Sequence, residues 1–144
     1  MRVIVAVFAA LLLLGEGASA DVLITAAEAA LPSSADVGLE LRGITRGPSL
    51  DQLSPKPAAR VRSPFALKIR FSAHNNTKVD AAAVKATYLK QPTVDLTERL
   101  RKYTKSDGID MPNAEAPAGT HIIRIELKDN LGRTSISTIK LIVE

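Results

Sequence analysis

Strict alternation of apolar and polar side chains near the end of the chain constrains the fold more than any other feature. One side of residues 121–128 carries His121, Ile123, Ile125 and Leu127. Residues 139–143 repeat the pattern with Ile139, Leu141 and Val143. Successive side chains of a β-strand point to opposite faces, so each segment predicts a strand with one buried face. The intervening turn contains Gly132, and the whole of 121–143 therefore predicts a β-hairpin.

Upstream segments carry the same signature. Phe65, Leu67, Ile69 and Phe71 fall on one side of a strand predicted over residues 65–71. Residues 84–88 alternate in the same way, and residues 50–53 and 93–96 are shorter strand candidates. Residues 96–104 indicate a helical turn or an irregular connection. Several short strands without a long helix between them predict an all-β sandwich, and 144 residues suit a single domain.

Two groups of residues resemble a known family. Residues 118–121, the alternating strand after them and residues 128–133 resemble the final hairpin of bacterial immunoglobulin-like and fibronectin type III-like modules. Residues 53–55 and 65–71 resemble the opening strands of these modules. The resemblance covers about residues 47–144 and implies an immunoglobulin-like antiparallel β-sandwich. It implies no particular activity, because such modules serve as adhesin repeats, enzyme appendages and envelope scaffolds.

The resemblance has two departures. His121 stands where the family often has a tyrosine whose hydroxyl bonds to the backbone. The tryptophan and the disulfide of antibody domains are also missing, because the chain has no Trp and no Cys. An aliphatic core must therefore supply the stability.

The first twenty residues predict a secretory signal peptide. Arg2 precedes twelve consecutive apolar residues, 3–14, and residues 18–20 (Ala-Ser-Ala) predict cleavage before Asp21. Twelve helical residues rise about 18 Å, which is too short for a hydrocarbon core of about 30 Å. We therefore expect an exported protein, periplasmic or secreted, without a membrane span in its mature chain.

Residues 21–46 are predicted to be an N-terminal extension of the sandwich. Thr25 and Glu28 have the spacing of a capping box, which favours a short helix ending before Pro32. A loose tail is the alternative, because so short a helix is marginal unless it docks. Residues 37–41 alternate and form a short strand candidate.

The residue inventory argues against catalysis. Without cysteine there is no thiolate nucleophile, and the two histidines, His74 and His121, are isolated from each other. His121 falls on the apolar side of its strand, so we expect a core residue; a small hydrolase using His121 is the alternative. The acidic residues Asp107, Asp110 and Glu115 lack the spacing of a calcium loop. We predict no metal site and no cofactor.

Positive charge concentrates in the middle of the chain. Residues 42–105 hold fourteen Lys and Arg against four Asp and Glu, a balance of +10, whereas residues 21–41 hold four acids and no base. If the bases share a face, they would attract an anionic partner such as an envelope phosphate, an acidic glycan or an acidic protein surface. The residues of this hypothetical basic face are Arg60, Arg62, Lys68, Arg70, Arg99, Arg101, Lys102 and Lys105. Neutralisation by the acidic N-terminal segment is the alternative, and nucleic acid is not expected because stacking aromatics are missing among the bases.

The outer side of the predicted hairpin carries Ile122, Ile136 and Ile142. If they adjoin, they form an apolar stripe that residues 24–31 or a partner subunit would cover. From these features we expect an exported, non-catalytic module with a binding or structural role in the cell envelope. The alternative is an accessory subunit that docks on a larger secreted protein through this hairpin face.

Overall fold

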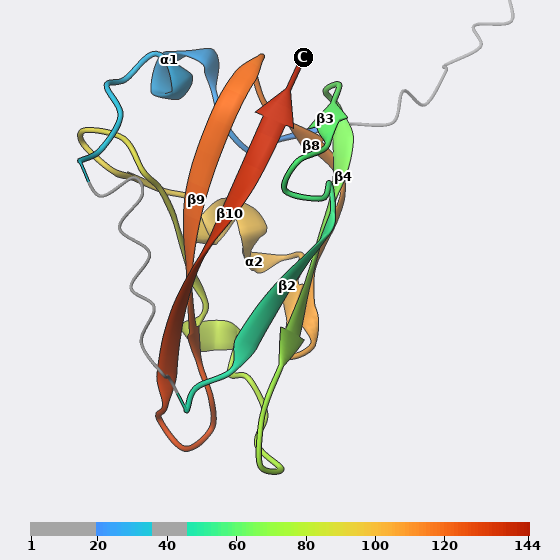
Figure 1. Cartoon of the computed structure of the whole chain (residues 1–144), viewed down its shortest axis with the longest axis vertical. Coiled ribbons are helices and arrows are strands. Elements are labelled where there is room, and N and C mark those ends of the chain that lie inside the picture. The colour runs from blue at the N-terminus through green and yellow to red at the C-terminus, as the bar shows by residue number, and fades with distance from the viewer. Residues whose placement is uncertain (1–19, 36–45) are drawn as a thin grey trace, which may run out of the picture.

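Two β-sheets packed face to face form the molecule in the computed structural model, which describes residues 20–35 and 46–144 (Figure 1). The first sheet consists of β2 (Ser49–Ser54), β4 (Phe65–Ser72) and β8 (Gly108–Glu115), with β1 (Asp21–Val22) and β7 (Thr104–Lys105) also paired to β8. The second sheet has the order β3 (Arg60–Val61), β10 (Thr134–Val143), β9 (Gly119–Lys128), β5 (Lys85–Tyr88) and β6 (Val94–Asp95). The predicted all-β sandwich is confirmed.

The helical elements among the described residues are short. They are α1 (Ala26–Ala29), the 3₁₀ turn η1 (Ala81–Ala83) and α2 (Thr97–Arg101), which lies within the helical turn predicted over 96–104. None of the helices in the described part of the chain has the length and apolar character needed to cross a membrane.

The predicted hairpin is present as β9 and β10, paired antiparallel from Thr134 opposite Lys128 to Val143 opposite Gly119. Its inward side chains meet those of β4 and β8. Leu67, Ile69, Ile109, Ile123, Ile125, Ile139 and Leu141 are at most 3% exposed. Burial of each such side chain stabilises the fold by about 1.5–3 kcal/mol, so this aliphatic layer holds the two sheets together.

The sandwich is not purely antiparallel as the family resemblance implies. β1 runs parallel to β8, and β3 runs parallel to β10. Both are two-residue strands at sheet edges. The segments that contain β1 and β3 run along the edges of the two sheets. By pairing there they satisfy backbone N–H and C=O groups that an edge strand would otherwise leave without partners.

The N-terminal segment is part of the sandwich. Leu23 and Ile24, which the sequence assigns to an extension, are 0% and 2% exposed and belong to the core. Thr25 and Glu28 form the predicted capping box at the start of α1. The strand candidate at 37–41 and the predicted signal peptide lie outside the described residues, apart from Ala20.

The three outward isoleucines of the hairpin do not form one stripe. Ile122 lies opposite Lys140, diagonal to Ile142, whereas Ile136 lies opposite Glu126. Six residues of extended strand place Ile136 about 20 Å from Ile142. The N-terminal segment therefore does not dock on a stripe there; it docks at the sheet edge and in the core.

An ion pair anchors the N-terminal segment to α2. Arg99 donates from Nη1 and Nη2 to the two carboxylate oxygens of Glu28, at 2.8 and 2.6 Å, and from Nη1 to the carbonyl of Leu23 at 2.9 Å. The hydrogen bonds from Arg99 hold the pKa of Glu28 at about 2, well below its ordinary value of 4.5, against the opposing effect of burial. Charged hydrogen bonds of this kind are worth about 1.5–3 kcal/mol.

We predict that Glu28→Gln lowers the melting temperature by several degrees above pH 5. Because the folded-state pKa of Glu28 is lowered, its contribution is complete above pH 4.5 and is lost as the pH falls towards 2. Thermal unfolding followed by circular dichroism should show the two proteins converging near pH 2. Glu98→Gln is the matched control, since Glu98 pairs with Arg101 at the exposed surface and should contribute little. A constant difference from pH 6 to pH 2 would contradict the assignment.

Candidate binding surfaces

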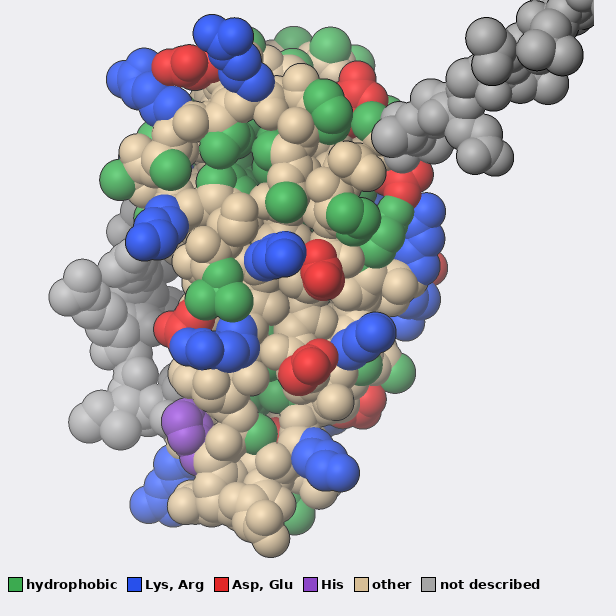
Figure 2. Space-filling model, turned by 90° about the vertical axis from the view of Figure 1, so that its right-hand side faces the viewer, with side chains coloured by type: hydrophobic (Ala, Val, Ile, Leu, Met, Phe, Trp, Pro, Cys, Tyr) green, Lys and Arg blue, Asp and Glu red, His purple; other side chains and the backbone are tan. Residues whose placement is uncertain are grey.

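The eight basic residues of the hypothetical basic face do not gather on one surface. Arg60 and Arg62 lie on and just after β3, at the edge of the second sheet. Arg99 turns to Glu28, and Arg101 pairs with Glu98 at 2.9 Å. Figure 2 views the molecule from the side of β2, β4 and β8, and Lys and Arg side chains are interspersed with Asp and Glu over this side. The basic stretch of sequence is therefore not a uniformly basic face.

The structure brings the other four bases, Lys68, Arg70, Lys102 and Lys105, around one shallow hollow on the outside of the first sheet. We call it the sheet hollow. Its lining also includes Leu53, Tyr103, Asp107, Gly108 and Asp110. Bases far apart in the sequence meet here because β7 and β8 fold back beside β4.

Local structure explains how the bases reach the sheet hollow. Lys68 and Arg70 point outward because Leu67 and Ile69 alternate inward on β4. Gly108 pairs with both Arg70 and Lys105. A Cβ at Gly108 would lie 2.0 Å from the Ile69 carbonyl oxygen, so only glycine allows the β7–β8 turn to approach β4 so closely. That approach places Lys105 beside β4.

The charges of the sheet hollow are partly compensated. Arg70 pairs with Asp51 at 3.1 Å and Lys102 with Asp21 at 2.9 Å. Acidic residues of the N-terminal segment thus neutralise the positive charges of Lys102 and Arg99, as the alternative given above expects. Among the described residues, Lys68 and Lys105 form no ion pair, and both are exposed. These two ammonium groups are the ones free to meet an anionic ligand.

His121 is a buried polar residue at one end of the sandwich. It is 2% exposed, its Nε2 donates to the Pro117 carbonyl at 2.7 Å, and its Nδ1 lies 2.8 Å from the Tyr88 hydroxyl. A carbonyl only accepts, so Nε2 carries the proton and Nδ1 accepts from Tyr88. Burial lowers the pKa of His121, aided by the charge of Lys90 and opposed by the bond to Pro117. The expectation that His121 is a core residue is confirmed.

We predict that His121 makes the stability fall as the pH is lowered below about 6.5. Its folded-state pKa is lowered, so its contribution is complete above the unfolded value of 6.5 and is lost as the pH falls below it. His121→Gln should remove this part of the dependence, measured as melting temperature against pH. Tyr88→Phe, which deletes the hydroxyl donor, should destabilise the fold by about 1–3 kcal/mol. An unchanged pH profile in His121→Gln would refute the assignment.

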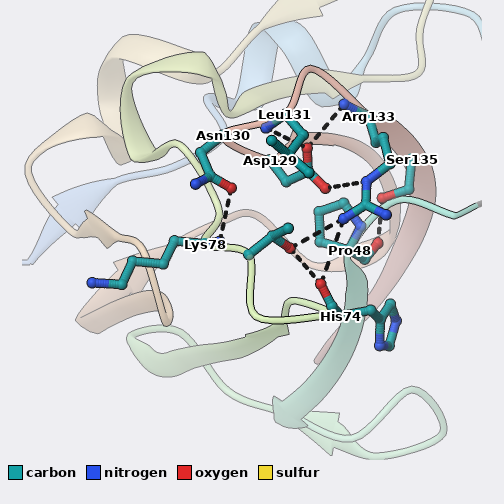
Figure 3. A network of polar contacts seen from close by, with 9 residues as sticks. Pro48, His74, Lys78, Asp129, Asn130, Leu131, Arg133 and Ser135 are labelled. Atoms are coloured by element: carbon teal, nitrogen blue, oxygen red, sulfur yellow. Dashed lines mark hydrogen bonds and ion pairs between the residues drawn. The ribbon is translucent and has the colours of Figure 1, made fainter.

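A second buried polar group, Asp129, organises the opposite end of the sandwich (Figure 3). It is 3% exposed and accepts from the backbone N–H groups of Leu131 and Arg133 and from Arg133 Nε, at 2.8–2.9 Å. Burial raises the pKa of Asp129, but the bonds from Arg133 and Leu131 outweigh it and leave the pKa below its ordinary value. The carboxylate thus fixes the β9–β10 turn.

This turn is also fastened to the loop after β4. Asn130 and Lys78 exchange two hydrogen bonds, from Asn130 N–H to the Lys78 carbonyl at 2.9 Å and from Lys78 N–H to Asn130 Oδ1 at 3.2 Å. Arg133 Nη2 reaches the His74 carbonyl at 3.5 Å and Thr77 Oγ1 at 3.4 Å. Sequence reasoning missed this network, although an aspartate opening a turn is a common signal of side-chain-to-backbone bonding.

The described residues contain no cluster of potential metal ligands, and the comparisons with known proteins found no match. In residues 20–35 and 46–144, no three His, Asp or Glu side chains come together so as to hold a metal ion, and this includes Asp107, Asp110 and Glu115. No protein-family model matches the chain, and no curated protein matches it at a significant level. The function must therefore be inferred from the surfaces themselves.

Proposed function

We propose that the chain is an exported immunoglobulin-like module that acts by binding in the cell envelope. The strand order supports the family. Immunoglobulin domains place their first, second and fifth strands in one sheet and their third, sixth and seventh in the other. The orders β2-β4-β8 and β5-β9-β10 correspond to this division. The bond from His121 to Pro117 also resembles the side-chain-to-backbone bond of the family tyrosine.

The two alternative functions find less support. A hydrolase using His121 needs an accessible imidazole, whereas both nitrogens of His121 are engaged inside the fold. An accessory subunit docking through the hairpin face would use a continuous apolar stripe, and Ile136 is separated from Ile122 and Ile142. Binding by a polar surface fits the geometry better.

The ligand class that the sheet hollow fits best is an acidic glycan. The observation that carries this proposal is the pair of exposed ammonium groups of Lys68 and Lys105 in one hollow. They would bind carboxylate, sulfate or phosphate groups. Asp107 and Asp110 in the same lining would accept hydrogen bonds from sugar hydroxyls, and Tyr103 offers an aromatic edge. A simple polyanion would be repelled by these carboxylates, whereas a sugar chain uses both kinds of group.

We predict that Lys68→Glu/Lys105→Glu weakens binding to polygalacturonate at least about tenfold, since each charged hydrogen bond lost is worth about 1.5–3 kcal/mol. Elution from a polygalacturonate column by a salt gradient measures the effect, and the wild type should elute at higher salt. Lys85→Glu/Lys140→Glu is the matched control, with the same change of charge on exposed residues of the second sheet.

Two outcomes would contradict the proposal. Equal elution of the two double variants would show that net charge alone governs retention. Binding of the wild type to a phosphocellulose column but not to polygalacturonate would assign the hollow to phosphate rather than to an acidic glycan.

A further inference from the structure

The charged residues of the sheet hollow occupy fixed positions in two neighbouring rows across the first sheet. In one row Arg70 lies opposite Gly108, and Gly108 lies opposite Lys105. In the other row Lys68 lies opposite Asp110. The four charged side chains of these rows are exposed on the outer face of the sheet. The backbone pairing therefore sets the spacing of the charged groups.

This spacing separates the two ammonium groups that form no ion pair. Lys68 lies on β4 and Lys105 on β7, with β8 between these strands. Strands are about 4.8 Å apart and rise about 3.4 Å per residue, so the two Cα atoms lie about 12 Å apart across the two rows. Both amines are positively charged and repel each other, which favours separate positions for them.

The net charge of the sheet hollow is close to balanced. Arg70 and Lys102 already pair with aspartates of β2 and β1. Two further carboxylates, those of Asp107 and Asp110, belong to the lining. The hollow therefore attracts an anionic ligand through the placement of its charges and not through an excess of positive charge.

The floor of the hollow is low between the two lysines. Gly108 carries no side chain, and the Ile69 carbonyl, 2.0 Å from the position of a Cβ, prevents any other residue from filling this place. Asp110 borders the floor on the same strand, and its carboxylate has no hydrogen-bond or ion-pair partner among the described residues. Tyr103 lies beside Asp110, whose N–H donates to the Tyr103 carbonyl at 3.1 Å. A ligand that crosses the floor thus meets a hydrogen-bond acceptor between two cations.

We propose that the ligand of the sheet hollow is an acidic oligosaccharide that bridges Lys68 and Lys105 with acidic groups on two non-adjacent sugar units. A sugar ring built from bonds of about 1.5 Å spans about 5 Å along the chain, so acidic groups two units apart come within reach of both flexible amines. The middle unit would lie over Gly108, where its hydroxyls donate to Asp110. The inference rests on the proposed function and adds to it a minimum length of the ligand.

Asp110 is the specificity-determining residue of this arrangement. A linear polyphosphate carries negative charge along its whole length, so its middle would lie against the Asp110 carboxylate and be repelled. A sugar unit places neutral hydroxyl groups at the same point. The acidic oligosaccharide is therefore favoured over a polyphosphate of similar length.

Nuclear magnetic resonance titration of the isotope-labelled protein tests the bridge, because it measures weak dissociation constants and locates the binding site. The probes are galacturonate and trigalacturonate at equal carboxylate concentration. Trigalacturonate should bind at least about tenfold more tightly, since the second contact of a bridging molecule forms at a high effective concentration. The amide signals of Lys68, Gly108 and Lys105 should shift together.

Two single variants separate bridging from simple attraction. Lys68→Gln and Lys105→Gln should each lower the affinity for trigalacturonate to about that for galacturonate, because either change removes one end of the bridge. The loss in the double variant should be smaller than the sum of the two single losses in free energy. Lys85→Gln, with the same change of charge on an exposed residue of the second sheet, is the matched control and should bind like the wild type.

Asp110→Asn tests the specificity. The dissociation constant for tripolyphosphate, divided by that for trigalacturonate, should fall about two- to fivefold, because the variant loses a repulsion as strong as an exposed charge pair. Glu126→Gln makes the same change of charge on β9 of the second sheet and should leave this ratio unchanged. All proteins are compared in the same processed form, so an α-ammonium group at Asp21 is common to them.

The failures are distinguishable. If trigalacturonate shifts no signal and polygalacturonate does not retain the wild type, the proposed function itself fails. Binding of trigalacturonate that is no tighter than that of galacturonate would overturn the bridge and leave glycan binding intact, as would strictly additive losses in the two lysine variants. An unchanged ratio in Asp110→Asn would overturn the assignment of specificity to Asp110.

Discussion

Burial of aliphatic side chains between the two sheets is the interaction on which the other features depend. The chain has no cysteine, so no disulfide supports the fold, and aromatic rings supply only a few of the core side chains, Phe65, Phe71 and Tyr88. Leucine, isoleucine and valine side chains from both sheets supply most of the core, and Leu23 and Ile24 of the N-terminal segment extend it. The burial of Leu23 and Ile24 in this core explains why the four-residue helix α1 is formed. α1 is held by the buried residues before it and by the Glu28–Arg99 pair, not by its own length.

An apolar core requires that the polar groups buried at its ends be satisfied, and His121 and Asp129 do this at opposite ends, with Ser135 donating to the Pro48 carbonyl near Asp129. His121 closes one end through Tyr88 and Pro117, and Asp129 closes the other through Leu131 and Arg133. No buried side-chain nitrogen or oxygen of the described residues lacks a hydrogen-bond partner. These polar residues therefore fix the loops at each end of the sandwich.

The outer surfaces follow from the same alternation that builds the core. Residues between the buried positions point outward, and on β4 these are Lys68 and Arg70. Because β7 and β8 return beside β4, Lys105 joins them, and carboxylates of the intervening turn enter the same hollow. A mixed polar surface results, and the proposed ligand, with both charged groups and hydroxyls, is inferred from it.

The sequence by itself determined the strands at 65–71, 84–88 and 121–143 and their inward faces, because period-2 alternation is a local property that survives any arrangement of the strands. It also placed His121 inside and Thr25 at a helix cap. Apart from the pairing of β9 with β10 in the predicted hairpin, only the tertiary structure decided which strands are neighbours and in what register. The eight bases, which all lie between residues 60 and 105, are therefore divided among different surfaces of the folded chain. Arg99 pairs with Glu28 instead of facing a ligand. Ile136 and Ile142 lie at different positions along β10 and do not form one stripe. The residues around Leu23 are too few to show a pattern, and their burial depends on contacts with β8, more than eighty residues away in the chain.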